Sequence, residues 1–316
     1  MPNFCRTDLP VAYVAVSVAT LWTDPDRPRP VDAAALTNPV DLPAWLAEMT
    51  LADKFGLSEH LLTQTQVLCG DSVYVLSEQA GWCRIAVPGQ TTPKNPLGYP
   101  GWVPKAQLSN DPGFAAAAAR WPSARVDVPT AWLYDDARLR SKSMQISFNT
   151  RLPRLERIDG ALLVGTPDHG ARWICAADVE VHGASNDASY PTGADLVDRA
   201  KRFVGVPYLW GGRSGFGLDC SGITSTVYEA AGVDLPRDAS AQARCAGGHQ
   251  VDDADLQPGD LLFWAHDDGT GAIHHVAMYS DDQHMIEAPG SADPVRITPV
   301  RFNSEYWGAR RFLSAG

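Results

Sequence analysis

The segment that most restricts the fold runs from Tyr208 to Gly222, where a glycine-rich stretch leads into a cysteine. After Cys220, apolar residues recur at helical spacing until Gly232, which predicts a helix that begins at the cysteine. Asp219 occupies the N-cap position of that helix. A cysteine in the first turn experiences the partial positive charge of the helix N-terminus, which favours the thiolate. The segment therefore predicts either a nucleophile or a small buried core residue.

A second pattern lies downstream and predicts a β-hairpin with a short acidic turn, formed by residues 272–279 and 284–288. If the turn is centred on Asp281, His275 and Glu287 are cross-strand neighbours on one face. A cysteine at a helix N-terminus, with a strand histidine oriented by a third polar group, is the arrangement of a thiol hydrolase. The hairpin therefore favours the nucleophile over the core residue.

Residues from about 192 to 316 resemble the NlpC/P60 family of cysteine peptidases. The resemblance rests on five motifs in the family's order: PYLWGG at 207–212, LDCSG at 218–222, LPRDAS at 235–240, LQPGDLLFW at 256–264 and HVAMY at 275–279. It implies a papain-like α+β core in which Cys220 is the nucleophile. It also implies His275 rather than His274 as the base, because the family's histidine directly precedes the valine of HVxxY.

The third catalytic position departs from the family pattern. Close relatives more often carry His, Asn or Gln where this chain has Glu287. A carboxylate can accept the imidazole N–H and stabilise imidazolium, so glutamate is compatible with catalysis. The expected catalytic group is therefore Cys220, His275 and Glu287.

Charge and cysteine content restrict the class of partner and the compartment. With 26 Lys and Arg against 37 Asp and Glu, the net charge is −11. This balance argues against nucleic acid and membrane surfaces as partners. The six cysteines are dispersed, with no CxxC pair and no metal-like Cys/His spacing. We therefore expect reduced thiols in a cytoplasmic protein, no metal site and no cofactor.

The N-terminal run Val11–Trp22 is apolar, and a signal peptide is the alternative to a first strand there. Asp8 precedes the run, which is short and contains alternating β-branched residues, so a strand is favoured. No run in the sequence reaches transmembrane length.

Two β-rich blocks precede the cysteine-containing region. The first has strand-like runs around a predicted helix at Leu42–Phe55. Short strands separated by Gly, Pro and Asp turns suit small barrels. The stretch 183–189 is a predicted linker, and Thr192 with Asp195 begins a predicted helix with a capping box. We expect three domains, at residues 1–123, 124–183 and 184–316.

Two SH3-like barrels followed by an NlpC/P60 domain resemble, over nearly the whole chain, the γ-D-glutamyl-L-diamino-acid endopeptidases of murein-peptide recycling. The specific matches in the first block are LTQTQVLCGDSVYVL at 62–76 and YPGWVPK at 99–105. The resemblance implies that the first barrel closes one end of the cleft and reads the free amine of the substrate. The residues that it assigns to substrate binding are Tyr99, Asp238, Tyr208, Trp210, Ser221 and Asp71.

Structural roles remain open for several of these residues. From sequence context alone, Tyr99 and Trp210 are also candidates for packing, and Asp238 is a candidate helix N-cap.

The resemblance implies a cysteine peptidase that cleaves between γ-D-Glu and diaminopimelate or Lys in peptides beginning with free L-Ala. Its partner is then a small murein peptide, whereas the diamino acid and the oligomeric state stay open. One alternative is a secreted wall-remodelling endopeptidase with the same catalytic domain. The other is a non-catalytic wall-binding protein, favoured if Glu287 marks a dead site.

Overall fold

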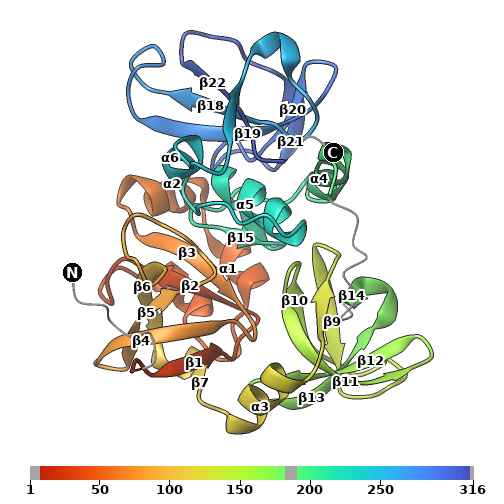
Figure 1. Ribbon diagram of the computed structural model, residues 1–316. Helices are drawn as coiled ribbons and strands as arrows, with labels where there is room; N and C mark the ends of the chain where they lie inside the picture. The colour runs from red at the N-terminus through yellow and green to blue at the C-terminus, as the bar shows by residue number, and fades with distance from the viewer. Residues whose placement is uncertain (1–7, 182–190, 314–316) are drawn as a thin grey trace. The chain divides into compact units, whose positions relative to one another are not determined.

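The computed structural model describes residues 8–181 and 191–313 (Figure 1). The chain folds into two compact units. The first comprises residues 1–50, 56–89 and 94–184, and the second comprises residues 51–55, 90–93 and 185–316. No helix among the described residues has the length and apolar character needed to cross a bilayer.

The first unit contains two seven-stranded sheets. The order of the first sheet is β3 (Thr63–Leu68), β2 (Val18–Trp22), β6 (Tyr99–Pro104), β5 (Trp82–Val87), β4 (Ser72–Gln79), β1 (Val11–Val14) and β7 (Leu108–Ser109). The helical segments in and around it are η1 (Pro30–Ala35), α1 (Leu42–Glu48), α2 (Leu51–Glu59) and η2 (Lys105–Gln107). Side chains such as Val14, Val67 and Ile85 form its core, which β-branched residues suit because they pack well on pleated strands.

The second sheet has the order β10 (Lys142–Ser147), β9 (Thr130–Tyr134), β13 (Gly170–Cys175), β12 (Ala161–Thr166), β11 (Arg151–Ile158), β8 (Ser123–Val126) and β14 (Val179–Val181). Helix α3 (Pro112–Arg120) connects the two sheets along the chain, and η3 (Ala176–Asp178) precedes β14. Cys69 and Phe114 join the core of the second sheet, so the two sheets share apolar contacts.

The second unit is built on a six-stranded sheet. Its order is β17 (His249–Val251), β22 (Tyr306–Arg311), β18 (Leu261–Ala265), β19 (Ile273–Asp281), β20 (His284–Glu287) and β21 (Arg296–Pro299). Three helices contact β19, namely α4 (Gly193–Lys201), α5 (Cys220–Ala230) and α6 (Ala239–Ala243). The smaller elements are η4 (Asp253–Asp255) and the short pair β15 (Arg213–Ser214) and β16 (Gly217–Leu218). This arrangement brings the start of α5 against the central strands.

The α+β fold class is confirmed, and so is the Thr192–Asp195 capping box at the start of α4. Two predicted elements are each divided. The predicted helix Leu42–Phe55 breaks at Met49, whose backbone is extended, into α1 and α2. The predicted strand Val11–Trp22 becomes β1 and β2, which pair with different strands. Periodicity along a continuous apolar run indicates the type of element but not where the chain leaves one strand partner for another.

The structure leaves the predicted domain boundaries undecided. The boundary after residue 123 falls at the first residue of β8. The predicted linker at 183–189 lies outside the described residues. The division into three domains therefore stays a prediction.

Candidate active site

Cys220 is the first residue of α5, where the sequence placed it. Asp219 caps the helix through Oδ1, which accepts a hydrogen bond from the Gly222 N–H at 2.6 Å. A Cβ atom at position 222 would lie 2.0 Å from the carbonyl oxygen of Gly212. The glycine of the CSG motif is therefore required by close backbone packing at the start of the helix.

A buried arginine fixes the cap. The Arg237 guanidinium donates to both carboxylate oxygens of Asp219, at 3.0 Å to Oδ1 and 2.6 Å to Oδ2. Its side chain is only 2% exposed. Arg237 also donates to Ser221 Oγ at 2.9 Å, and Gly211 N–H donates to Asp219 Oδ2 at 2.9 Å. This bidentate pair holds the backbone that carries the Cys220 thiol.

His275 and Glu287 are joined by a hydrogen bond of 2.8 Å between Nε2 and Oε2. The predicted register of the hairpin is wrong by two residues. Met278 lies opposite Ile286, so the continued register sets Glu287 opposite Ala277. A slip of two residues leaves every side chain on its original face, because the side-chain period of a strand is two. His275 is therefore a diagonal neighbour that still reaches the carboxylate.

Glu287 is buried and surrounded by donors that sequence reasoning missed. Arg301 donates to both carboxylate oxygens at 2.8 Å, and Arg296 donates to Oε1 at 3.2 Å. Burial raises the pKa of Glu287, but hydrogen bonds from His275 and Arg301 outweigh it and hold the pKa well below its usual range. The carboxylate is thus ionised beside the imidazole, and the arginines balance its charge.

The electrostatic setting of Cys220 differs from the prediction. Burial raises the pKa of its thiol to about 12, and the nearby Asp219 carboxylate adds to this effect. Backbone hydrogen bonds from Val276 and Ser221 act in the opposite direction but are weaker. The prediction of a favoured thiolate is therefore wrong for the unliganded protein, because loss of water outweighs the helix N-terminus.

Cys220 and His275 line one cavity of about 170 Å³ in the second unit. Its other lining residues are Tyr208, Trp264, His274, Pro289, Arg301, Asn303 and Glu305. With His275 Nε2 engaged by Glu287, Nδ1 is the nitrogen left for proton exchange with the thiol. The cavity thus combines a cysteine, an oriented imidazole and space for a reacting group.

His274, the competitor for the base role, occupies a different environment. Its ring stacks on His266 with the centroids 4.3 Å apart, and its Nε2 lies 3.5 Å from Glu305 Oε2. Burial and the neighbouring His266 lower the pKa of His274. Its carboxylate contact is longer and more exposed than that of His275, which favours His275 as the base.

Among the residues assigned to substrate binding, only Tyr208 lines this cavity. Trp210 is half-buried. Ser221 Oγ lies in the buried network, where it donates to Asp219 Oδ1 at 3.2 Å and accepts from Arg237. Their contacts with substrate stay predictions.

The remaining three assigned residues have defined local surroundings. Asp238 occupies the N-cap position of α6, without a side-chain capping bond. Tyr99 is buried in the core of the first sheet, and its hydroxyl accepts a hydrogen bond from Lys94. Asp71 Oδ2 accepts the Leu68 N–H at 3.1 Å in the turn after β3. The roles of Asp238, Tyr99 and Asp71 toward substrate stay predictions.

Comparison with known proteins agrees with this organisation. Residues 205–314 match the model of the NlpC/P60 family, and residues 126–182 match that of the YKFC SH3b2 domain. A γ-D-glutamyl-L-lysine dipeptidyl-peptidase from Bacillus cereus is 43% identical over 96% of this chain and 91% of its own length. One from Bacillus subtilis is 36% identical over 95% of this chain and 98% of its own. The crystal structure of an NlpC/P60 family protein from Bacillus cereus matches with a TM-score of 0.91 at 42% identity, covering 96% of this chain and all of that one.

Proposed function

This chain belongs to the NlpC/P60 family of cysteine peptidases, and from that premise we propose that it hydrolyses the bond between γ-D-glutamate and a diamino acid in murein peptides. The substrate begins with free L-Ala, and its diamino acid is lysine or meso-diaminopimelate. Two relatives named γ-D-glutamyl-L-lysine dipeptidyl-peptidases support this substrate class, because each aligns over nearly its whole length. The observation that carries the proposal is the 2.8 Å His275–Glu287 bond beside the cavity that Cys220 lines.

The reaction proceeds by acyl transfer to sulfur. Cys220 Sγ attacks the γ-carbonyl carbon while His275 takes the thiol proton, and the imidazolium then protonates the departing amine. Water, deprotonated by His275, hydrolyses the thioester and restores the thiol. The backbone N–H of Cys220, at the start of α5, donates to the developing oxyanion.

The high pKa of the resting thiol determines when its proton moves. Because burial raises the pKa of the Cys220 thiol, the cavity holds no unpaired thiolate before substrate binds. Substrate places its carbonyl oxygen at the backbone N–H of Cys220, and proton transfer to His275 then accompanies attack. Glu287, already ionised, stabilises the imidazolium that forms.

The free amine of the substrate is the proposed basis of selectivity. Asp238 supplies the carboxylate for this amine at the start of α6. The neighbouring Arg237 donates its backbone N–H to the Thr91 carbonyl at 3.0 Å, which fixes the chain directly before Asp238. A site built for an ammonium rejects an acylated amine, because its own charge is then left unpaired.

Such a peptide is a product of wall degradation, so we place the protein in cytoplasmic murein-peptide recycling. The five cysteines within the described residues are free thiols, which supports a reducing compartment. Cell fractionation against cytoplasmic and extracellular markers tests this placement.

Product analysis tests the activity. Mass spectrometry of L-Ala-γ-D-Glu-Lys and L-Ala-γ-D-Glu-diaminopimelate digests should show the dipeptide L-Ala-γ-D-Glu and the free diamino acid. The N-acetylated forms are the matched control and should remain intact. Efficient cleavage of acetylated or glycan-linked peptides would instead indicate a general wall-lytic endopeptidase.

A further inference from the structure

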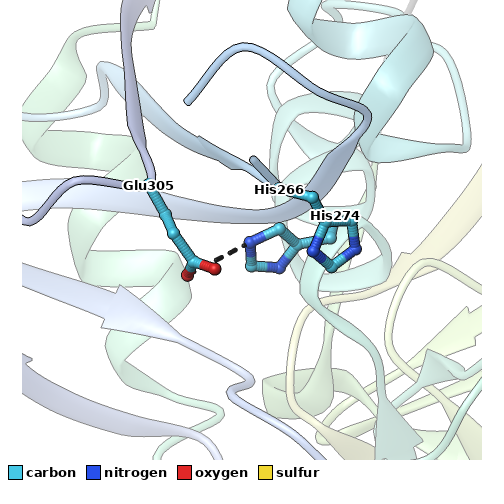
Figure 2. A group of neighbouring side chains, drawn as sticks. All are labelled: His266, His274 and Glu305. Carbon is cyan, nitrogen blue, oxygen red and sulfur yellow. Dashed lines mark ion pairs between the residues drawn. The ribbon is translucent and has the colours of Figure 1, made fainter. Parts of the chain in front are cut away.

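Two histidines and a glutamate converge at the ends of three interior strands of the six-stranded sheet (Figure 2). His266 follows β18, His274 lies on β19 and Glu305 directly precedes β22. One ring nitrogen of each histidine and one carboxylate oxygen of Glu305 lie within 4.8 Å of one another. The catalytic steps described above use none of these three side chains.

The backbone holds the three residues in register. The His266 N–H donates to Ala272 O at 3.0 Å, and the Gly271 N–H donates to His266 O at 2.8 Å, which closes a tight loop before β19. The Ala265 N–H donates to Glu305 O at 2.8 Å. The cluster therefore rests on hydrogen-bonded backbone, although its side chains reach solvent.

The side chains are arranged as a ligand set. The two imidazole rings stack with an interplanar angle of 22°, and Figure 2 shows the Glu305 carboxylate approaching from the side. Two imidazoles and one carboxylate, with a fourth position left to water, form a common set around zinc. Zinc bonds of about 2.0–2.2 Å require ligand atoms roughly 3.4 Å apart. His274 Nε2 and Glu305 Oε2 are already 3.5 Å apart, whereas the stacked rings must turn for a nitrogen of each histidine to face the same ion.

We propose that His266, His274 and Glu305 form a Zn²⁺-binding site that controls access to the Cys220 cavity. His274 and Glu305 line that cavity together with Cys220 and His275. An ion held between them, with its water, fills part of a cavity of only about 170 Å³. Zinc bound here inhibits the peptidase reversibly, and this consequence rests on the proposed function, whereas the binding itself does not.

Binding is tested by calorimetry with Zn²⁺ and the full-length Cys220→Ala protein, which lacks the thiol that lines the same cavity. We expect one saturable site per chain, with affinity at least tenfold weaker in the additional variants His266→Ala and Glu305→Gln. His284→Ala, which removes an exposed histidine from β20, is the matched control and should bind as Cys220→Ala does. Equal affinity in His266→Ala, or no saturable binding, overturns the site.

Inhibition is tested separately on the protein with Cys220 intact. His266 does not line the cavity, so His266→Ala should keep the zinc-free rate of L-Ala-γ-D-Glu-Lys hydrolysis. It should require at least tenfold more Zn²⁺ than the unsubstituted protein for half inhibition. If both are inhibited at the same concentration, zinc acts through the thiol and the proposed control of access is wrong. If no peptide is cleaved at all, the proposed function fails while the calorimetric result still decides the metal site.

Discussion

His275 and Glu287 meet diagonally across two antiparallel strands, through a 2.8 Å bond between Nε2 and Oε2. Arg301 donates two further 2.8 Å bonds to the same carboxylate, one to each oxygen. An anion that would be costly to bury alone is thereby paired with a guanidinium and available to an imidazolium. This pairing gives a physical reason why a glutamate can occupy this buried position beside the imidazole.

Substitution of Glu287 tests the orienting role. Glu287→Gln keeps the shape but removes the charge that stabilises imidazolium, so kcat should fall roughly 10- to 1000-fold, with a smaller change in KM. Steady-state kinetics across pH measures both. A pH–rate profile identical to that of the unsubstituted protein would show that another group holds His275.

The two arginines should differ in importance. Arg301 makes two short bonds to Glu287, whereas Arg296 makes one at 3.2 Å. Arg301→Met should therefore raise the pKa of Glu287 and move the acidic limb of the kcat profile to higher pH. Arg296→Met serves as the matched control and should move it less. Equal shifts in the two variants would contradict the account.

Acid stability should reflect the ionised carboxylate. The folded-state pKa of Glu287 is lowered, so its stabilising contribution is present above the unfolded value of about 4.3 and is lost as pH falls through the folded value. Urea unfolding between about pH 5 and pH 2 should thus show a weaker pH dependence in Glu287→Gln. If the free energy of unfolding varied with pH equally in Glu287→Gln and the unsubstituted protein, ionisation of Glu287 would not contribute to acid stability.

Cys220 should behave as a neutral thiol in the unliganded protein. Because burial raises its pKa to about 12, the rate of iodoacetamide alkylation should keep rising above pH 9, without an inflection near neutrality. Peptide mapping locates the label, and Cys220→Ala provides the blank. An inflection below about pH 7 would indicate a stable thiolate–imidazolium pair instead.

The buried ion pair between Arg237 and Asp219, the N-cap residue of α5, should contribute strongly to the stability of the folded protein. Arg237→Met leaves Asp219 buried without its partner, which typically costs about 3–5 kcal/mol. Arg244→Met removes an exposed guanidinium at the end of α6 and should have little effect. Chemical denaturation measures the free energy of unfolding of both variants. If Arg237→Met lowers it by less than about 1 kcal/mol, the pair contributes no more than a surface salt bridge and the expectation is wrong.

Local signals predicted the start of α5 and the pairing of His275 with Glu287. The N-cap residue Asp219 and the helical spacing after Cys220 are local features, so the sequence alone indicates where the helix begins. The hairpin register was missed because the turn residues Asp282 and Gln283 both adopt positive φ, which moves the turn beyond Asp281. A turn of that kind favours Asn or Gly, so this pair gives a weak signal.

Tertiary packing determines what the sequence could not indicate. Arg301 reaches Glu287 from 14 residues away, and no spacing rule links them. The pKa of Cys220 depends on burial by elements that fold around α5, so helix position alone predicted the wrong direction. His266, His274 and Glu305 likewise come from three separate segments, which hides them from any search for short metal-binding motifs.

The most direct test of the central claim is the turnover of L-Ala-γ-D-Glu-Lys by the Cys220→Ala protein, followed by mass spectrometry of the products. A melting curve recorded on the same sample establishes that the variant is folded. The account predicts a native-like melting curve with no detectable L-Ala-γ-D-Glu, while the unsubstituted protein releases it. Substantial release of the dipeptide by folded Cys220→Ala would contradict the assignment of Cys220 as the nucleophile.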